Sequence, residues 1–329
     1  MARITNYEKQ YIKSLREISK YGYADGVNER TGIVTKRLPG MVLRVDLGKE
    51  FPILKSKFVA AKTALNEILW IWQKQSNNIN DLNAKIWDSW ADDNGSIGKA
   101  YGYQMNQPVN LYLDVPKKSD EAFRSYKNQA EFVIEYFREQ PNGRWAVTTL
   151  WSPSELAGME FLPCCHTTTC NLDGGKLNLV LDQRSGDMPY GVAFNTTQYA
   201  ELAALIANDL GVPLGIMTHV IADAHIYANQ FDGVDLQLRY YDVLEALERE
   251  DEEDANMYAH ELHKAIPEYP DTDTHHDSVM QRAIDCIDCT PKFYYGDEKN
   301  VSFFKVDSNI CHMEDYKNMG KITFGEVAV

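Results

Sequence analysis

The sequence predicts an α+β protein, with helices packed on a mixed sheet in a single domain. Apolar side chains recur at helical spacing in residues 6–20 and 62–75, and residues 197–210 form a further apolar segment of helical type. Residues 176–182 instead alternate apolar and polar side chains, which is typical of a strand with one buried face. Helices mixed with antiparallel-looking strands indicate the α+β class.

The remaining elements follow from the same two periodicities and from turn residues. A polar, glycine-rich stretch over 92–102 predicts a loop that lines a site. In chain order we expect a helix at 6–20, strands within 36–47 broken at Pro39-Gly40, a helix at 62–75, the 92–102 loop, a helix at 119–140, a strand at 144–151, a hairpin at 166–182, a helix at 197–210 and a strand at 218–227.

Bulk composition excludes several classes of protein. The chain has 329 residues, 44% of them hydrophobic and 25% charged, which suits a globular protein with a large core. Its net charge of −15 argues against general binding to nucleic acid or to a membrane surface. A small phosphate site built from a few arginines remains compatible with this charge.

Residues 1–10 are polar and lack the apolar core of a signal peptide. The most apolar run, 200–210, contains Glu201, Asn208 and Asp209, so we expect no membrane-spanning segment. Six cysteines show no disulfide-framework spacing, which favours a reduced, cytoplasmic protein.

Residues 243–289 differ from the rest of the chain. An acidic run covers 248–254, and several residues of metal-ligating type follow it: His260, His263, His275, His276 and Cys286-x-x-Cys289. Such residues can form a metal or partner site, but one Cys-x-x-Cys with scattered histidines is weak evidence for zinc. We therefore interpret this stretch as a solvated helical segment and expect no metal.

A hairpin in the middle of the chain predicts the site. The strand-like runs 166–172 and 176–182 flank Asp173-Gly174-Gly175, a turn sequence that tolerates positive φ. Cys164 lies ten residues before the middle glycine of this turn and Arg184 ten residues after it. An antiparallel hairpin would bring thiol and guanidinium to the same end, and a nearby cation stabilises a thiolate. The pattern thus predicts an activated cysteine beside an anion site.

These residues resemble the thymidylate synthase family, and the resemblance covers nearly the whole chain. The family's nucleophile motif corresponds to Pro163-Cys164, Gln183-Arg184-Ser185-Gly186-Asp187 and Phe194-Asn195. Further landmarks follow in the family's order: Glu29-Arg30-Thr31-Gly32, Phe51-Pro52, Glu67-Ile68-Leu69-Trp70, Ile86-Trp87-Asp88-Ser89-Trp90, Tyr101-Gly102, Asp223-Ala224-His225-Ile226-Tyr227 and Val327-Ala328-Val329. The resemblance implies one catalytic domain over 1–329, with an acidic insertion at about 243–289, in a homodimer whose subunits meet sheet to sheet.

The resemblance implies a catalytic group of Cys164, Glu67, Tyr101 and Arg184. Cys164 would add to C6 of a pyrimidine, which makes C5 nucleophilic. Glu67 lies in an otherwise apolar helix, where a carboxylate needs a partner or a task, and the family uses it to move protons. Cys165, which follows Cys164 directly, is expected on the opposite strand face, as a small buried side chain.

The resemblance also implies the residues that bind the nucleotide: Arg30, Arg144, Arg184 and Ser185 for phosphate, Asn195 for the base, and His225 and Tyr227 for the sugar 3′-hydroxyl. Arg144 would be donated across the dimer interface. Asn195 favours uracil, because a side-chain amide can satisfy both N3–H and O4. Trp145 stands where the family usually has a second arginine, and Lys36 or Arg37 could replace that charge.

The implied cosubstrate is 5,10-methylenetetrahydrofolate, bound by Lys57, Trp87, Trp90, Asp187 and Val329. Trp87 and Trp90 would stack near its flat rings, and Lys57 would lie near its anionic tail. Residues 326–329 would close over the bound ligands and exclude water.

The resemblance implies a thymidylate synthase, which converts dUMP to dTMP. Trp145, Cys165 and the strand Thr167-Thr168-Thr169-Cys170 leave open a pyrimidine-nucleotide 5-hydroxymethylase, in which water replaces the hydride. A nucleotide- or RNA-binding regulator that kept the fold is a third alternative. The presence of Cys164, Glu67 and Tyr101 argues against it, as does the net charge of −15.

Overall fold

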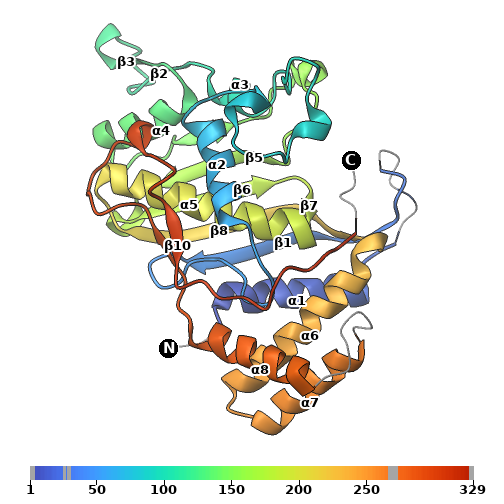
Figure 1. Ribbon diagram of the computed structural model, residues 1–329. Helices are drawn as coiled ribbons and strands as arrows, with labels where there is room; N and C mark the ends of the chain where they lie inside the picture. The colour runs from blue at the N-terminus through green and yellow to red at the C-terminus, as the bar shows by residue number, and fades with distance from the viewer. Residues whose placement is uncertain (1–3, 25–26, 28–30, 266–272, 326–329) are drawn as a thin grey trace.

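A computed structural model describes residues 4–24, 27, 31–265 and 273–325. It is organised around a six-stranded sheet in the order β1-β8-β6-β5-β4, with β7 also paired to β8 (Figure 1). The strands are β1 Thr35–Asp46, β4 Val147–Thr149, β5 Cys165–Asn171, β6 Leu177–Gln183, β7 Gly186–Asp187 and β8 Leu214–Tyr227. β6 and β7 run parallel to β8 and the other pairs are antiparallel, so the predicted mixed sheet is confirmed.

Helices pack against this sheet, which confirms the α+β class. They are α1 Asn6–Tyr21, α2 Ala61–Trp72, α3 Gly102–Met105, α4 Gln129–Glu139, α5 Ala193–Leu210, α6 Phe231–Glu248, α7 Glu252–Ala265 and α8 Asp273–Asp288. Two small hairpins complete the fold: β2 Val109–Tyr112 with β3 Phe123–Tyr126, and β9 Lys292–Tyr294 with β10 His312–Glu314. In Figure 1, α6, α7 and α8 lie together at one end of the molecule and the β2–β3 hairpin at the other.

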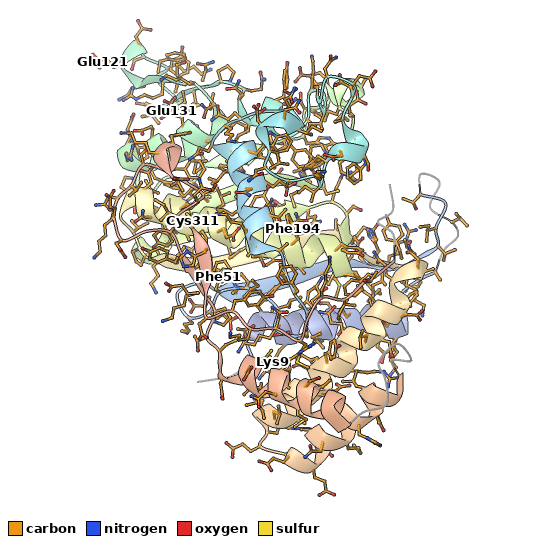
Figure 2. The ribbon with its side chains drawn as sticks, in the orientation of Figure 1. Lys9, Phe51, Glu121, Glu131, Phe194 and Cys311 are labelled. Carbon is orange, nitrogen blue, oxygen red and sulfur yellow. The ribbon has the colours of Figure 1, made fainter. Side chains whose placement is uncertain are left out.

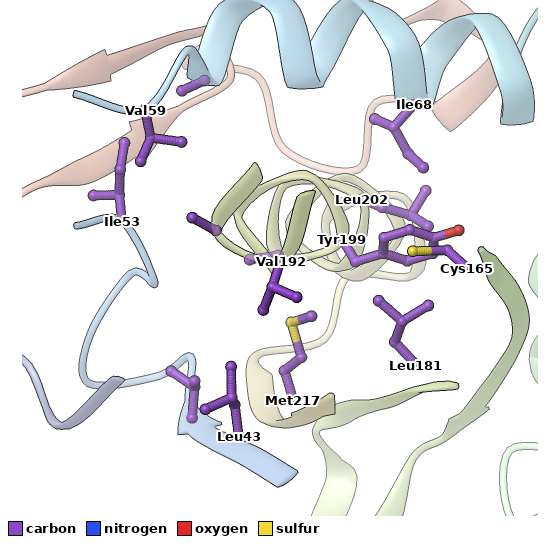
Figure 3. Close-up of a cluster of buried hydrophobic side chains, with 14 of the residues drawn as sticks. Leu43, Ile53, Val59, Ile68, Cys165, Leu181, Val192, Tyr199, Leu202 and Met217 are labelled. Atoms are coloured by element: carbon purple, nitrogen blue, oxygen red, sulfur yellow. The ribbon is translucent and has the colours of Figure 1, made fainter. Parts of the chain in front are cut away.

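The core lies between one face of the sheet and α5. α5 packs on β6 and β8, α1 packs on β1, and α2 packs on the outer side of α5. Figure 3 shows Tyr199 and Leu202 of α5 among Cys165, Leu181 and Met217 of the sheet, all of them buried. Alternation along β6 points its apolar side chains at this layer, as predicted.

The other face of the sheet carries exposed side chains such as Val42 of β1 and Val147 of β4. It is the face on which a sheet-to-sheet dimer, as the resemblance implies, would form.

Local sequence explains how these elements begin and end. The Thr5 hydroxyl accepts a hydrogen bond from the Glu8 amide at 3.1 Å and caps α1. α5 ends at Gly211, whose φ of 68° is the left-handed conformation that glycine adopts most readily. Gly174 and Gly175 have φ values of 68° and 70°, so the turn predicted between β5 and β6 is confirmed.

The predicted helix at 119–140 was wrong in its first half. Phe123–Tyr126 is strand β3, paired with β2, and the helix begins only at Gln129. The side chain of Asn128 accepts from the Glu131 amide at 2.8 Å, which starts α4 at that point.

The predicted break at Pro39-Gly40 was also wrong. Strand β1 continues through both residues, with Pro39 opposite Asp223 and Met41 opposite Ile221 in unbroken register. β1 is an edge strand, where a proline without an amide hydrogen is tolerated, and Gly40 adopts a φ of 70°.

Residues 243–265 and 273–289 lie mainly in the end of α6, in α7 and in α8, in agreement with the helical interpretation. That they form an insertion stays a prediction. The side chains of His263, His275 and His276 lie outside the described residues. In the part of the chain described, no helix is both long and apolar enough to cross a membrane.

Candidate active site

A cavity of about 500 Å³ opens where α2, the 85–90 segment, the β5–β6 hairpin and the start of α5 converge. Phe194, labelled near the centre of Figure 2, is one of its lining residues. Eight residues that the sequence predicted for a site also line this cavity: Glu67, Trp87, Trp90, Tyr101, Cys164, Ser185, Asp187 and Asn195.

The hairpin brings Cys164 and Arg184 together, as its symmetry predicted. The Arg184 amide donates to the Cys164 carbonyl at 3.0 Å, and a guanidinium nitrogen lies 3.8 Å from the Cys164 Sγ. The guanidinium is held by the carbonyls of Leu162 and Pro163 at 2.7 and 3.0 Å. A fixed cation at this distance stabilises negative charge on sulfur.

The two adjacent cysteines have different surroundings. Cys164 is half-buried, whereas Cys165 is only 4% exposed and packs beside Tyr199. Burial raises the pKa of the Cys165 thiol well above its usual range. The pairing of β5 with β6 is irregular between Cys165 and Thr167, so Cys165 also lines the cavity instead of simply turning away, as strict alternation predicted.

Tyr101 contacts the cysteine segment directly. Its hydroxyl accepts a hydrogen bond from the Cys164 amide at 3.2 Å, and its backbone has an unusual φ of 43°. The next residue, Gly102, lies so close to Ser76 that a Cβ there would come within 1.9 Å of the Ser76 carbonyl oxygen. The close approach fixes the backbone that carries Tyr101. Burial raises the Tyr101 pKa, so its hydroxyl stays neutral.

Glu67 is buried on α2 and bonded at both oxygens. The indole nitrogen of Trp87 donates to Oε1 at 2.5 Å, and the amide nitrogen of Gln198 donates to Oε2. Burial raises the carboxyl pKa to about 7, although both hydrogen bonds act in the opposite direction. A carboxyl group with this pKa can accept or release a proton at neutral pH.

Aromatic rings form one wall of the cavity. Trp87 packs edge to face against Trp90, Tyr101 and Phe161, with ring centroids 5.6, 5.0 and 5.8 Å apart. Trp87 is buried, whereas Trp90 is partly exposed. The wall offers apolar surface for a flat ring system, and Trp87 also orients Glu67.

Asp187, His225 and Tyr227 meet where β7 pairs with β8. Asp187 lies opposite His225 in register, and the rings of His225 and Tyr227 are 5.1 Å apart. The Asp187 carboxylate accepts from Gln230 at 2.8 Å and from the Tyr190 amide at 3.2 Å. Burial raises the Asp187 pKa. His225 and Tyr227 lie beside the cavity and are not among its lining residues.

Lys57 lies next to the last described segment of the chain. Its ammonium donates to the Pro189 carbonyl and lies 4.8 Å from the centre of the Phe324 ring. Burial lowers its pKa to about 8. The Tyr190 hydroxyl donates to the Gly325 carbonyl at 2.9 Å, so this segment rests against a residue that lines the cavity.

Among the predicted residues, Arg144 lies away from the cavity within its own chain. Arg144 is exposed and precedes β4, in which Val147 pairs with Thr169. Five residues of strand separate Thr169 from Cys164, which corresponds to roughly 17 Å. Arg30 and Val329 lie outside the described residues.

Sequence reasoning missed Gln198, which lines the cavity and contacts Glu67. One signal was present: Gln198 follows Asn195 by three residues in a helix, so both lie on the same face. In the described part of the chain, no group of three or more His, Cys, Asp or Glu side chains is arranged to hold a metal ion.

Comparison with known proteins identifies the family of this chain. A sequence model described as thymidylate synthase matches residues 9–329. A thymidylate synthase of Clostridium beijerinckii is 42% identical over 235 residues, covering 70% of this chain and 81% of that protein. Thymidylate synthase 1 of Bacillus subtilis is 34% identical over 246 residues, covering 71% and 84%.

A solved structure, the thermostable thymidylate synthase A from Bacillus subtilis, superposes with a TM-score of 0.74 at 28% identity and covers 98% of this chain and 99% of its own. Its fold agrees with the mixed sheet and packed helices described above. On the match over residues 9–329 and the identity to these relatives, the chain belongs to the thymidylate synthase family, whose members are one-carbon transferases.

Proposed function

We propose that this protein is a thymidylate synthase that converts dUMP to dTMP with 5,10-methylenetetrahydrofolate. The observation that carries the proposal is one cavity holding a cysteine beside a fixed guanidinium, a tyrosine hydroxyl and a carboxyl group with a pKa of about 7. These are the groups needed to add a thiolate to C6 of a pyrimidine and to move protons during the reaction.

Cys164 is the proposed nucleophile. Its sulfur lies 3.8 Å from the Arg184 guanidinium, and its segment is held by Tyr101. The Sγ–C6 bond forms as the C5–C6 double bond moves its electrons toward C5 and the O4 carbonyl. C5 then acts as the carbon nucleophile.

Glu67 and Tyr101 are the proposed proton-transfer residues. Glu67 can give a proton toward the base as charge develops on O4 and can take one back later, because its pKa is about 7. Tyr101, whose raised pKa keeps it neutral, is suited to orient a water or base near C5. General acid–base assistance of this type typically contributes about 10²- to 10⁴-fold in rate.

Arg184, Ser185, Arg144 and Arg30 are proposed for the phosphate, because guanidinium gives paired, charge-assisted hydrogen bonds. Asn195 lines the cavity and is proposed for the base. His225 and Tyr227 are proposed for the sugar 3′-hydroxyl.

The folate is proposed to bind in the same cavity. The aromatic wall of the cavity suits a flat pterin, and the partly buried Asp187 carboxylate can accept hydrogen bonds from pterin N–H groups. Trp87, Trp90 and Asp187 would hold the ring end, Lys57 would act near the anionic tail, and Val329 belongs to the segment proposed to cover both ligands. The folate supplies the one-carbon unit and the hydride.

We expect a homodimer in which Arg144 serves the partner's site, because Arg144 is distant from Cys164 within its own chain. A mixture of Arg144→Ala and Cys164→Ala proteins, each inactive alone, should regain up to about a quarter of full activity, since half of the subunits form mixed dimers with one intact site. Activity would be followed after subunit exchange, with mixing verified by differently tagged chains. No recovery in mixed dimers would contradict the assignment of Arg144.

A pyrimidine-nucleotide 5-hydroxymethylase acting on dUMP, dCMP or CMP is the second candidate. The observation that favours it is Cys165, which lines the cavity beside the proposed nucleophile. In that reaction water attacks the exocyclic methylene and tetrahydrofolate leaves unchanged in oxidation state. In the synthase the folate gives up a hydride and leaves as dihydrofolate.

The deciding experiment incubates the purified protein with methylenetetrahydrofolate and, separately, dUMP, dCMP, UMP and CMP. The mass of each nucleotide and the absorbance of dihydrofolate are measured. We expect a methyl gain on dUMP alone, with one dihydrofolate per nucleotide. A hydroxymethyl gain with tetrahydrofolate retained would replace this proposal by the hydroxymethylase.

A further inference from the structure

We propose that Gln198 is a positioning residue that fixes the orientation of the Asn195 side-chain amide, and that this orientation selects uracil over cytosine. The inference rests on the proposed function, because it names what sets the substrate class at the same site. It depends on a continuous line of hydrogen bonds that runs from Glu67 to the buried His219.

Gln198 has only one orientation that satisfies its neighbours. Its side chain is 2% exposed, and its amide nitrogen donates to the Glu67 carboxylate and, at 3.4 Å, to the Ala64 carbonyl. The backbone carbonyl can only accept, so it holds the nitrogen on that side whichever way Glu67 is protonated. The oxygen of Gln198 therefore faces Asn195 and accepts from its Nδ2 at 3.3 Å.

Gln183 holds the other end of the Asn195 amide. Its nitrogen donates to the Ser185 carbonyl at 2.9 Å and to the Asn195 Oδ1 at 3.3 Å. Its oxygen lies 2.7 Å from the Nε2 of His219. The Ser185 carbonyl can only accept, so it keeps the Gln183 nitrogen on its own side and leaves the Gln183 oxygen toward His219, whose Nδ1 lies 3.0 Å from the Thr196 hydroxyl.

The two glutamines together determine what Asn195 presents to the cavity. Each amide oxygen has two acceptor positions and each amide nitrogen two hydrogens, so Asn195 retains one acceptor and one donor position. Uracil offers N3–H and O4, which match them. Cytosine offers an acceptor at N3 and a donor at N4, so it would require the amide to turn over. In the reversed orientation, the Asn195 nitrogen would face the Gln183 nitrogen and the Asn195 oxygen would face the Gln198 oxygen.

The first test is Gln198→Met, which preserves side-chain length but removes the hydrogen bonds to Glu67, Ala64 and Asn195. Dissociation constants for dUMP and dCMP would be measured by calorimetry in the parent and the variant. We expect the preference for dUMP to fall about tenfold, because loss of the fixed Asn195 orientation should cost about as much as one net hydrogen bond. A fall of less than about threefold would overturn the inference.

Gln198→Glu separates the two contacts and serves if the methionine variant does not fold. An oxygen still faces Asn195, so the preference for dUMP should stay within about threefold of the parent. The new carboxyl group lies beside Glu67, and two adjacent buried carboxyl groups do not ionise together readily, so the last proton of the pair should leave at higher pH and the inflection of kcat near pH 7 should move upward. The proposal would be contradicted if Gln198→Glu lost the preference for dUMP while its kcat inflection stayed at the pH of the parent.

In the parent protein, three titratable side chains beside Glu67 do not contribute to the pH readout near neutrality. Tyr101, Cys165 and Tyr199 face the carboxylate, and burial raises the pKa of all three well above their usual values. They therefore remain neutral across the range in which Glu67 titrates.

Gln237→Met provides the matched control. Gln237 is also fully buried and bonds to the Ser56 hydroxyl at 3.1 Å, but it does not line the cavity. Its replacement should change stability without changing the preference for dUMP. If the parent itself binds dUMP no better than dCMP, the proposed function fails; if the parent discriminates and Gln198→Met still does, only this inference fails.

Discussion

Replacement of Cys164 by alanine is expected to abolish turnover, lowering kcat on the order of 10⁴-fold or more, as loss of a covalent nucleophile does in other enzymes. The reason is that Arg184 stabilises charge on this sulfur, at 3.8 Å, and the neighbouring thiol cannot substitute. Cys165 is buried and its raised pKa keeps it protonated. The check combines steady-state rates with the mass of the denatured protein, which should lose its nucleotide adduct.

Cys165→Ala is the matched control for this prediction. It removes a sulfur from a buried position beside Tyr199, which should lower stability by about 1 kcal/mol. The cysteine that forms the adduct remains, so kcat should stay within about tenfold of the parent. An active Cys164→Ala protein together with an inactive Cys165→Ala protein would reverse the assignment of the nucleophile.

Replacement of Glu67 by glutamine is expected to lower kcat by about 10²- to 10⁴-fold, the usual contribution of general acid–base catalysis. The structural reason is a carboxyl group with a pKa of about 7 that lines the cavity and is bonded by Trp87 and Gln198. The parent should show an inflection in kcat near pH 7 that disappears in the variant. A variant that retains this inflection would show that another group titrates there.

The same carboxyl group should make stability fall as pH rises. Burial lifts its pKa from 4.5 to about 7, so between these values the folded protein keeps a proton that the unfolded chain releases. Below pH 4.5 both states hold the proton, and the difference grows until pH 7, where it reaches 2.5 × 1.36, or about 3 kcal/mol. Denaturant unfolding at several pH values should show a smaller decline for Glu67→Gln.

Glu201→Gln is the control for this pair of measurements. Glu201 is also buried on α5 with its pKa raised well above the usual range, but it does not line the cavity. Its replacement should change how stability depends on pH and leave the inflection in kcat in place. Loss of that inflection in Glu201→Gln would mean that the inflection in kcat cannot be assigned to Glu67.

The amino-acid sequence by itself determined the features whose causes are local. The β5–β6 hairpin follows from two strand-like runs around a glycine turn, and its symmetry was enough to predict that Cys164 and Arg184 lie together. The periodicity of α1 and α5 likewise needs no distant partner, because helical hydrogen bonds and an apolar face are encoded within each segment.

Only the tertiary structure decided features that depend on distant partners. Residues 123–126 form a strand because β2 pairs with them, and β1 continues through Pro39 because β8 holds its register. Within the site, Gln198 meets Glu67 across 131 residues of sequence. No periodicity or motif within either segment predicts that contact. It arises because α2 packs on α5, and this packing turns a carboxyl group and an asparagine from separate helices into one hydrogen-bonded unit.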